Sequence, residues 1–162
     1  MTPMLNHPNP QMTYREATLD DCPLLAEMNH QLIRDEGHRN PMNVAELTER
    51  MRGWLAGGDY RAMLFERDAR PVAYALFRAE SESGIYLRQF FVSREHRRKH
   101  IGAEAINLLF REVFPAGVRV VLEVLAANEL GRGFWEAVGF QSYAITLERF
   151  NEARRRTPGE NN

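Results

Sequence analysis

The fold and the function of this chain both depend on one stretch of its sequence, Phe90-Phe91-Val92-Ser93-Arg94-Glu95-His96-Arg97-Arg98-Lys99-His100-Ile101-Gly102-Ala103. Its first residues are apolar, as in a buried strand, and a basic turn then leads into the start of a helix. The first turn of a helix has unpaired backbone N–H groups and a partial positive charge, so it can bind several phosphate oxygens at once. The small residues Gly102 and Ala103 let such a group approach. The stretch therefore predicts a diphosphate site between a strand and a helix.

The glycine pattern of this turn excludes the two commonest nucleotide-binding loops. The turn has neither the G-x-x-x-x-G-K-[ST] motif of P-loops nor the G-x-G-x-x-G motif of dinucleotide-binding folds, so ATP and NAD are poor candidates. A solvated surface turn would also explain the charges, but the strand before the turn and the helix after it favour an anion site. We therefore expect a different ligand that carries a diphosphate.

On both sides of this stretch the sequence alternates between strand and helix patterns. Acidic residues and an early proline at residues 20–23 favour a helix start, and Asn43 with Glu46 resembles a capping box. The expected elements are strands at 12–17, 60–66, 72–79, 85–92, 118–125 and 140–147, and helices from 20 to about 36, 43–56, 102–114 and 130–138. This order predicts an α/β fold (an α+β mixed sheet) with an antiparallel N-terminal meander and a central βαβ crossover.

Length and composition limit the chain to one domain of ordinary globular character. Its 162 residues are 44% hydrophobic, which is enough for a single core without a disulfide or a metal. Residues 1–11 and 151–162 are polar and contain prolines, so we expect flexible tails around a domain at 12–150.

Cysteine usage and charge exclude several other classes. Cys22 is the only cysteine, which rules out an internal disulfide and argues against a structural zinc site. No signal segment is recognisable and no apolar run approaches the roughly 20 residues of a membrane span, so a cytoplasmic protein without a membrane partner is expected. A net charge of -1 and a single compact basic cluster argue against a nucleic-acid-binding surface.

Two blocks of the sequence resemble the GNAT superfamily of acyl-CoA N-acyltransferases. The segment Arg97-Arg98-Lys99-His100-Ile101-Gly102 is similar to the [QR]-x-x-G-x-[GA] motif that binds the coenzyme A pyrophosphate in that family. Residues 122–140 resemble its second block, which has a strand, an asparagine, a short helix with an aromatic residue and a closing Gly-Phe. His100 stands where the family has its first glycine, so the backbone there either keeps ordinary dihedral angles or is reshaped.

The resemblance implies transfer of an acetyl or similar acyl group from acetyl-CoA to a primary amine by direct attack on the thioester, without a metal. The strands that end near residues 92 and 125 would then separate, and pantetheine would pair with the first of them. Asn128 is equally explained by an Asx turn that starts a helix. The cofactor contacts implied by the resemblance are Phe91, Val92, Arg97, Arg98, Lys99, His100, Ile101, Gly102, Ala103, Asn128 and Trp135.

The acceptor amine must lose a proton, because free amines have a pKa near 10 and are mostly charged at about pH 7, and a nearby carboxylate can accept it directly or through water. Glu123 is the candidate, since it is a lone acid in an apolar strand, where a charge needs a partner or a cavity. An ion pair with Arg88 or Arg119 is the alternative role. Trp135 replaces the tyrosine that commonly protonates the leaving thiolate in the family, so we expect Trp135 to form a pocket wall or part of the core. Tyr143 or water could protonate the thiolate instead.

The loop at residues 34–42 is the expected source of acceptor specificity. Asp35, Glu36 and His38 could attract a cationic amine, although a solvated loop explains them as well. The altered His100 and Trp135 leave a weakly active or non-enzymatic acyl-CoA sensor as the second functional hypothesis. The sequence leaves open the acceptor amine, the acyl chain and the oligomeric state, for which a homodimer is one alternative.

Overall fold

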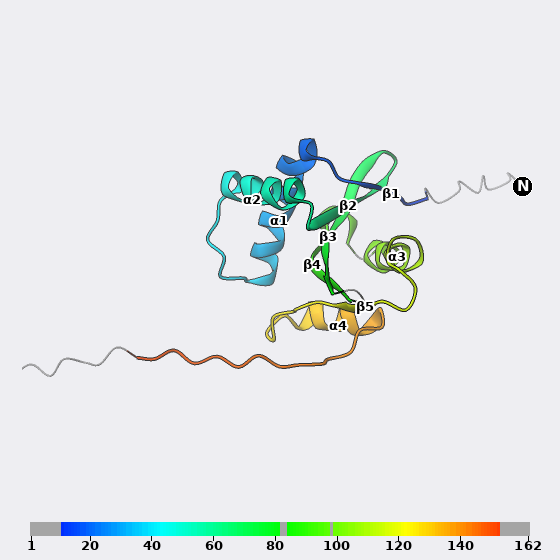
Figure 1. The fold of residues 1–162 in the computed structure, drawn as a ribbon. Helices are drawn as coiled ribbons and strands as arrows, with labels where there is room; N and C mark the ends of the chain where they lie inside the picture. The colour runs from blue at the N-terminus through cyan, green and yellow to red at the C-terminus, as the bar shows by residue number, and fades with distance from the viewer. Residues whose placement is uncertain (1–10, 82–83, 98, 153–162) are drawn as a thin grey trace, which may run out of the picture.

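A five-stranded mixed sheet forms the centre of the computed structural model, which describes residues 11–81, 84–97 and 99–152. The strand order is β1-β2-β3-β4-β5 (Figure 1). The first four strands are antiparallel neighbours and β5 runs parallel to β4, so the expected meander and βαβ crossover are both present. The strands are β1 (Thr13–Glu16), β2 (Tyr60–Arg67), β3 (Arg70–Ser81), β4 (Gly84–Val92) and β5 (Arg119–Val121).

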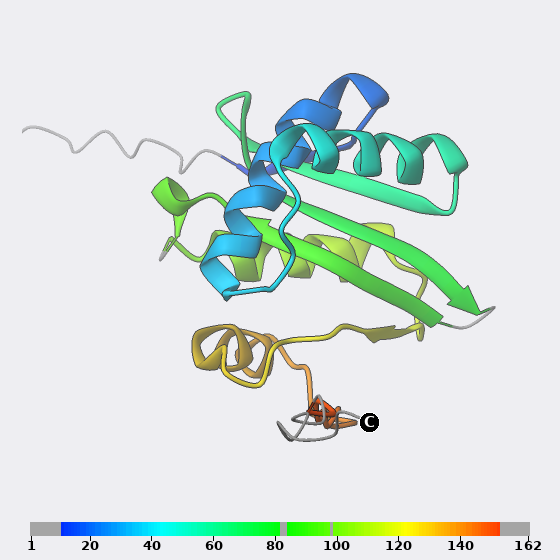
Figure 2. The ribbon, with the colours of Figure 1, turned by 90° about the vertical axis from the view of Figure 1, so that its left-hand side faces the viewer.

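Helices cover both faces of the sheet. α1 and α2 lie on one face and α3 on the other, while α4 runs beside the chain that leaves β5 (Figures 1 and 2). α3 continues into one π-helical turn, Leu109–Val113. The helices are α1 (Cys22–Glu36), α2 (Val44–Gly57), α3 (Ile101–Leu108) and α4 (Glu129–Ala137), within a few residues of the predicted bounds except at the C-terminal end of α3.

The facing ends of α1 and α2 follow from local sequence. Gly37 ends α1 in the left-handed conformation, at φ 66°, which glycine adopts without steric cost. Asn43 caps α2, because its side chain accepts a hydrogen bond from the Glu46 N–H at 2.9 Å. The Gly37 cap places Asp35 and Glu36 in the last turn of α1.

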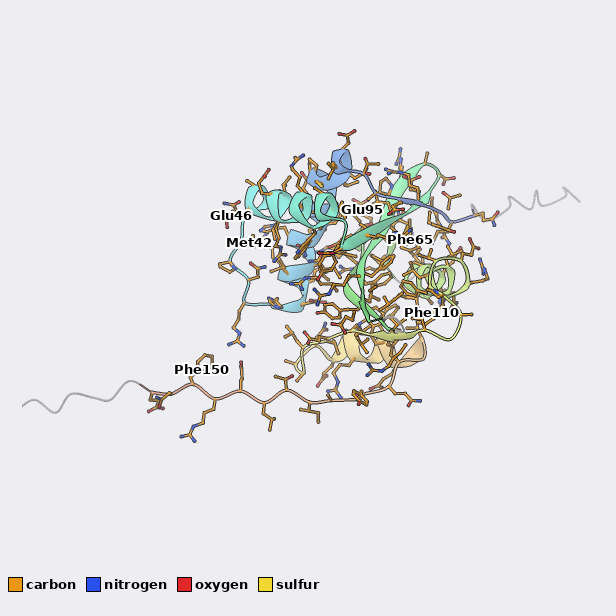
Figure 3. All side chains as sticks on the ribbon, viewed as in Figure 1. Met42, Glu46, Phe65, Glu95, Phe110 and Phe150 are labelled. Carbon is orange, nitrogen blue, oxygen red and sulfur yellow. The ribbon has the colours of Figure 1, made fainter. Side chains whose placement is uncertain are left out.

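The strands of the meander bury alternate side chains in two cores, one on each face of the sheet. Tyr74 and Leu64 pack towards α1 and α2. Phe65 and Phe77 pack with α3 on the other face. Phe65 lies in the interior, as Figure 3 shows, and burial of one such side chain stabilises the fold by about 1.5–3 kcal/mol.

The predicted final strand at residues 140–147 is wrong. The chain after Phe140 is extended but pairs with no strand of the described residues, and it runs away from the body of the domain (Figure 1). Tyr143, Ile145 and Leu147 are 87%, 85% and 89% exposed. A strand needs a neighbouring strand to supply its backbone hydrogen bonds. Within the described part of the chain, this segment contacts the rest of the domain through side chains only.

The crossover does not lie at the centre of the sheet as predicted. Because no strand follows α4 in the described residues, β5 is the last strand of the sheet and the β4-α3-β5 unit lies at its edge. The expected strand at 118–125 is reduced to Arg119–Val121. An edge strand forms backbone hydrogen bonds to one neighbour only, so fewer interactions hold its residues in an extended conformation than in a central strand.

None of the helices in the described part of the chain is long and apolar enough to cross a membrane. Residues 1–10 and 153–162, which make up most of the predicted flexible tails, lie outside the described residues.

Candidate active site

β4 and β5 pair only briefly and then separate, as the resemblance implied. Their register joins Gly84 with Arg119, Ile85 with Val120 and Tyr86 with Val121, and no later pair forms. Figure 2 shows the two segments moving apart beyond this point, with α1 near the open end. The β4 backbone from Leu87 to Val92 therefore faces this gap without a strand partner. An extended ligand could pair with it in the way that an added strand pairs with a sheet edge.

The turn after β4 keeps a glycine-like backbone even though histidine replaces glycine. His100 directly precedes α3 and has φ 58° and ψ 14°, in the left-handed region. Histidine is one of the few residue types enriched there among non-glycine residues. The first alternative, ordinary dihedral angles at His100, is therefore wrong, and the N–H groups of the first turn of α3 lie directly after this left-handed residue.

Arg97 and Asp35 tie this turn to the end of α1. Arg97 donates from Nη2 to the Asp35 carboxylate at 2.6 Å and from Nε to the Val92 carbonyl at 2.9 Å. Arg94 forms a second ion pair with Asp35. Burial raises the pKa of Asp35, but the hydrogen bonds from Arg94 and Arg97 outweigh burial and hold the pKa below its usual value. Asp35 is thus neutralised, and the prediction that it attracts a cationic amine is wrong.

The other predicted cofactor-contact residues in and beside the basic turn differ in exposure and in the space around them. Ile101 is 1% exposed and Phe91 is 2% exposed, so their side chains belong to the core. Lys99 is exposed, and Arg98 lies outside the described residues. A Cβ atom on Gly102 would lie 2.9 Å from Phe134 Cε2, so glycine is required there by the packing of α4.

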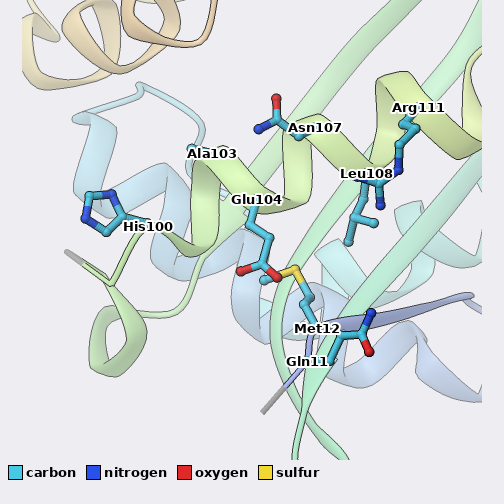
Figure 4. A pocket seen from close by; sticks show the side chains of 8 residues that line it. All are labelled: Gln11, Met12, His100, Ala103, Glu104, Asn107, Leu108 and Arg111. Carbon is cyan, nitrogen blue, oxygen red and sulfur yellow. The ribbon is translucent and has the colours of Figure 1, made fainter. Parts of the chain in front are cut away.

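An open pocket of about 470 Å³ lies against the outer side of α3 (Figure 4). His100, Ala103 and Glu104 line its α3 wall, and Gln11 and Met12 line the side next to β1. Its lining includes no residue of α4 or of the chain after β5. The pocket therefore does not coincide with the gap between β4 and β5.

Asn128 and Trp135 both have structural roles: Asn128 starts a helix and Trp135 packs in a cluster of aromatic side chains. Asn128 caps α4 by accepting a hydrogen bond from the Gly131 N–H at 3.0 Å. The Trp135 ring packs at 4.9–5.5 Å, centroid to centroid, against Phe90, Phe134 and Phe140. Contact of either residue with a cofactor stays a prediction.

Glu123 lies at the point where the strands separate, but it is not buried. It follows the end of β5 by two residues and is exposed. Neither Arg88 nor Arg119 forms an ion pair with it in the described part of the chain, and Arg119 instead stacks 4.7 Å from the Tyr143 ring. Burial, and then the charge of Glu123, raise the pKa of Tyr86. Glu123 is therefore close to the last paired residue of β4.

Glu36 is more buried than its place beside the polar loop indicated. It lies in the last turn of α1 and is half-buried, and burial followed by the charge of Asp35 raises its pKa. The buried Tyr74, whose hydroxyl donates to Gln89 Oε1 at 2.9 Å, has its pKa raised by burial and, more weakly, by Glu36. The helical spacing of Leu25, Asn29 and Glu36 on one face of α1 is the signal that could have placed Glu36 towards the sheet.

Because folding raises the pKa of Glu36, the native state binds more protons than the unfolded state and stability falls as pH rises through that pKa. We expect Glu36→Gln to be more stable than the wild type at neutral pH, where the buried charge is removed. Its advantage should shrink as pH falls through the raised pKa of Glu36, and it should be nearly lost below the ordinary glutamate value of about 4.3, where Glu36 is protonated in both states. Urea unfolding across this range measures the difference, with exposed Glu49→Gln as the control. A difference that is constant with pH would contradict the burial of an ionised Glu36.

The site belongs to an α/β protein with a mixed sheet, in which the two parallel strands separate in front of the N-terminus of a helix. The sequence model of the acetyltransferase (GNAT) family matches residues 25–140, and the chain belongs to this family. No curated protein matches the chain significantly by sequence.

Solved structures with the same fold include three informative acetyltransferases. A predicted acetyltransferase from Clostridium acetobutylicum with acetyl-CoA is 22% identical, with a TM-score of 0.67 over 86% of this chain and 96% of its own. Aminoglycoside N-acetyltransferase AAC(6')-Iy in complex with CoA is 14% identical, with a TM-score of 0.70 over 93% and 99%. Ribosomal-protein-alanine N-acetyltransferase from Brucella melitensis biovar Abortus 2308 is 17% identical, with a TM-score of 0.67 over 87% and 100%. At these identities the likeness shows the fold.

Proposed function

We propose that this chain is an N-acyltransferase that moves an acetyl group from acetyl-CoA to a primary amine. The observation that carries the proposal is the unpaired β4 edge from Leu87 to Val92, which runs directly into the basic turn and the N-terminus of α3. An extended pantetheine fits such an edge, and a diphosphate fits the helix start. Family membership supports the acetyl-CoA assignment, and the aminoglycoside and ribosomal-protein-alanine enzymes support an amine acceptor.

Each group of the site has a role in this reaction. Backbone N–H groups at the start of α3 hold the pyrophosphate, and Arg97 releases the Val92 carbonyl so that pantetheine can pair with it. The amine nitrogen attacks the thioester carbonyl, while a backbone N–H near Val92 donates to the developing oxyanion. The C–S bond then breaks, and the thiolate leaves without a dedicated acid because thiols ionise near pKa 8.5.

The two carboxylates of the site have separate roles in this proposal. Glu123, at the mouth of the gap, accepts the proton that the amine loses, either directly or through water. Glu36, half-buried beside Tyr74, attracts the ammonium form of the acceptor and orients it.

Thiol release from acetyl-CoA in the presence of a panel of primary amines tests the proposed function. Acetyl-CoA at about 100 times its Kd should also raise the free energy of unfolding by about 2.7 kcal/mol. Binding without turnover for every amine would support the alternative, an acyl-CoA sensor. If acetyl-CoA does not bind at all, both hypotheses are wrong.

We also propose that the chain forms a homodimer through its extended segment 141–150. Tyr143, Ile145 and Leu147 alternate along this segment and expose their apolar side chains, and Tyr143 lies beside Arg119 of β5, the last strand of the sheet. Exposed apolar strands and open sheet edges pair with each other when two copies meet.

Substitution of the apolar side chains tests the dimer. The double variant Ile145→Lys/Leu147→Lys should be monomeric by light scattering, whereas Ala144→Lys/Thr146→Lys, on the other face of the extended segment, should remain dimeric. A wild-type chain that is monomeric at all accessible concentrations would exclude the dimer.

A further inference from the structure

Two arginines from different elements stack on the same indole on the α1 and α2 side of the sheet. The Arg50 guanidinium of α2 lies 4.6 Å from the centroid of the Trp54 ring, and the Arg88 guanidinium of β4 lies 4.7 Å from it. We refer to Arg50 and Arg88 as the arginine pair. Burial lowers the pKa of Arg50. The nearby positive charge of Arg88 lowers it further.

No carboxylate of the described residues forms an ion pair with either member of the arginine pair, although nine other arginines in the same part of the chain have acidic partners. The polar partners of the pair are neutral. Arg50 donates from Nη2 to Asn29 Oδ1 at 3.0 Å, and Arg88 donates from Nη1 to the Tyr60 hydroxyl at 3.3 Å. The Nε of Arg50 is buried and has no partner. The pair therefore has unused donors and an excess of positive charge.

Packing alone does not explain this arrangement. Stacking of a guanidinium on an indole is weakly favourable when the group is partly solvated. Two like charges on one ring repel each other, and a buried donor without an acceptor is unfavourable. A bound oxyanion would remove both penalties, because a carboxylate accepts charge-assisted hydrogen bonds from guanidinium groups.

The arginine pair lies at the beginning of the gap between β4 and β5. Arg88 follows Tyr86, the last β4 residue that pairs with β5, by two positions. The β3-β4 register shifts between the pairs Leu76–Gln89 and Phe77–Leu87, so Arg88 is the extra residue of a bulge. Bulges redirect side chains and are common beside active sites. The bulge aims Arg88 at Trp54 of α2, on the face that also carries Glu36.

We propose that the arginine pair binds an anionic group of the acceptor, so that the acceptor is a small amine that also carries a carboxylate, such as an amino acid. The inference rests on the proposed N-acyltransferase function and specifies its substrate class. Tyr74 is close enough to both Arg50 and Glu36 that, after the larger effect of burial, the charge of Arg50 lowers its pKa and the charge of Glu36 raises it, so the arginine pair and Glu36 belong to the same region of this face. The carboxylate of the acceptor thus binds at the arginine pair and its ammonium at Glu36.

The chemical step conserves all groups. The acceptor ammonium loses one proton to a carboxylate of the site before it attacks, and the nitrogen loses a second proton, to water or to the departing thiolate, as its bond to the acetyl carbon becomes an amide bond. The bond from that carbon to sulfur breaks, and its electron pair leaves with the coenzyme A thiolate. The acceptor carboxylate is unchanged throughout, so it contributes only to binding and orientation.

Matched acceptors test the assignment of the carboxylate. Amino acids, their amides and the corresponding decarboxylated amines are compared as acceptors, and O-phosphoethanolamine with ethanolamine tests whether a phosphate substitutes for the carboxylate. We expect kcat/KM for the amino acids to exceed that for their amides by about 10- to 100-fold, as for charge-assisted hydrogen bonds. Equal values for amino acids and amides would overturn the proposal, and so would a preference confined to phosphate.

Variants of the pair provide the second measurement. Arg50→Gln and Arg88→Gln should each raise KM for amino acids by about 10-fold or more, leave the amides unaffected and leave acetyl-CoA affinity unchanged by calorimetry. Arg78→Gln is the matched control, because Arg78 also stacks on Tyr60, at 5.4 Å, but has Glu80 as an ion-pair partner. If the variants raise KM equally for amino acids and for amides, the arginine pair has a structural role only and the proposal is wrong.

A binding measurement separates failure of this inference from failure of the proposed function. If no amine is acetylated although acetyl-CoA binds, N-acetyl amino acids and their amides are titrated into the protein with CoA present. If the N-acetyl amino acids bind more tightly than their amides, and this difference disappears in Arg88→Gln, the anion site is supported independently of turnover. Absence of any difference would overturn it.

Discussion

Glu123→Gln should lower kcat by about 10²-fold, the lower end of the contribution of a general base, without changing acetyl-CoA affinity. The amine must lose a proton during the reaction, and at about pH 7 an amine with a pKa near 10 is mostly charged. Glu123 lies beside Tyr86, where β4 and β5 separate. Steady-state kinetics with an amine that the wild type acetylates, together with calorimetry, measure both quantities.

Two further variants make this test specific. Glu36→Gln should mainly raise KM for the amine, because Glu36 attracts the ammonium group in the proposed mechanism. Glu129→Gln, at the exposed start of α4, should change neither constant. If kcat of Glu123→Gln is unchanged between about pH 6 and 9, Glu123 is not the base. A reversal of the two patterns would assign the proton transfer to Glu36.

Signals that act within a few residues predicted the structure well. Gly37 and Asn43 set the facing ends of α1 and α2 because a left-handed glycine and a side-chain cap each satisfy backbone groups of their own helix. The apolar runs and the turns between them gave the meander. The resemblance correctly indicated that the parallel strands separate, although strand pairing itself is a long-range property.

Predictions that required a distant partner were less accurate. The alternation of Tyr143, Ile145 and Leu147 indicates a segment able to form a strand, but it does not say which edge completes the pairing. The interpretation of Glu123 as a buried acid assumed a central strand, and β5 ends two residues earlier at the edge of the sheet. Both errors concern the same missing neighbour of β5.

The acceptor side shows the same limit for charged residues. Asp35 and Glu36 are adjacent in sequence, but the helix turns Asp35 towards Arg94 and Arg97 and leaves Glu36 half-buried near Tyr74. Which of the two carboxylates is neutralised depends on a turn about 60 residues away in the chain, so local polarity could not decide it. The arginine pair was missed for the same reason, because Arg50 and Arg88 meet only through the tertiary fold.

Gly102→Ala should destabilise the protein and weaken acetyl-CoA binding, although alanine is the better helix former. The added Cβ would lie 2.9 Å from Phe134 Cε2. The Phe134 ring has little freedom to yield, because it stacks on Phe90 at 5.9 Å and packs against Trp135 at 4.9 Å. Overpacking of this kind costs about 1–3 kcal/mol, which exceeds the gain of about 1 kcal/mol in helix propensity. Displacement of α3 relative to α4 would then disturb the proposed pyrophosphate site at the start of α3.

The matched control for this variant is Gly53→Ala in α2, where nothing lies within 4 Å of the added Cβ. Gly53→Ala should stabilise the protein by up to about 1 kcal/mol and leave acetyl-CoA binding unchanged. In the double variant Gly102→Ala/Phe134→Leu the shorter side chain makes room for the methyl group. The effects of the two substitutions on the free energy of unfolding should therefore be less than additive, by about 0.5–3 kcal/mol. Acetyl-CoA affinity should recover together with this coupling, because the Cβ faces α4. If stability recovers and affinity does not, the methyl group blocks the pyrophosphate directly, and glycine is needed at position 102 for the ligand as well as for the helix.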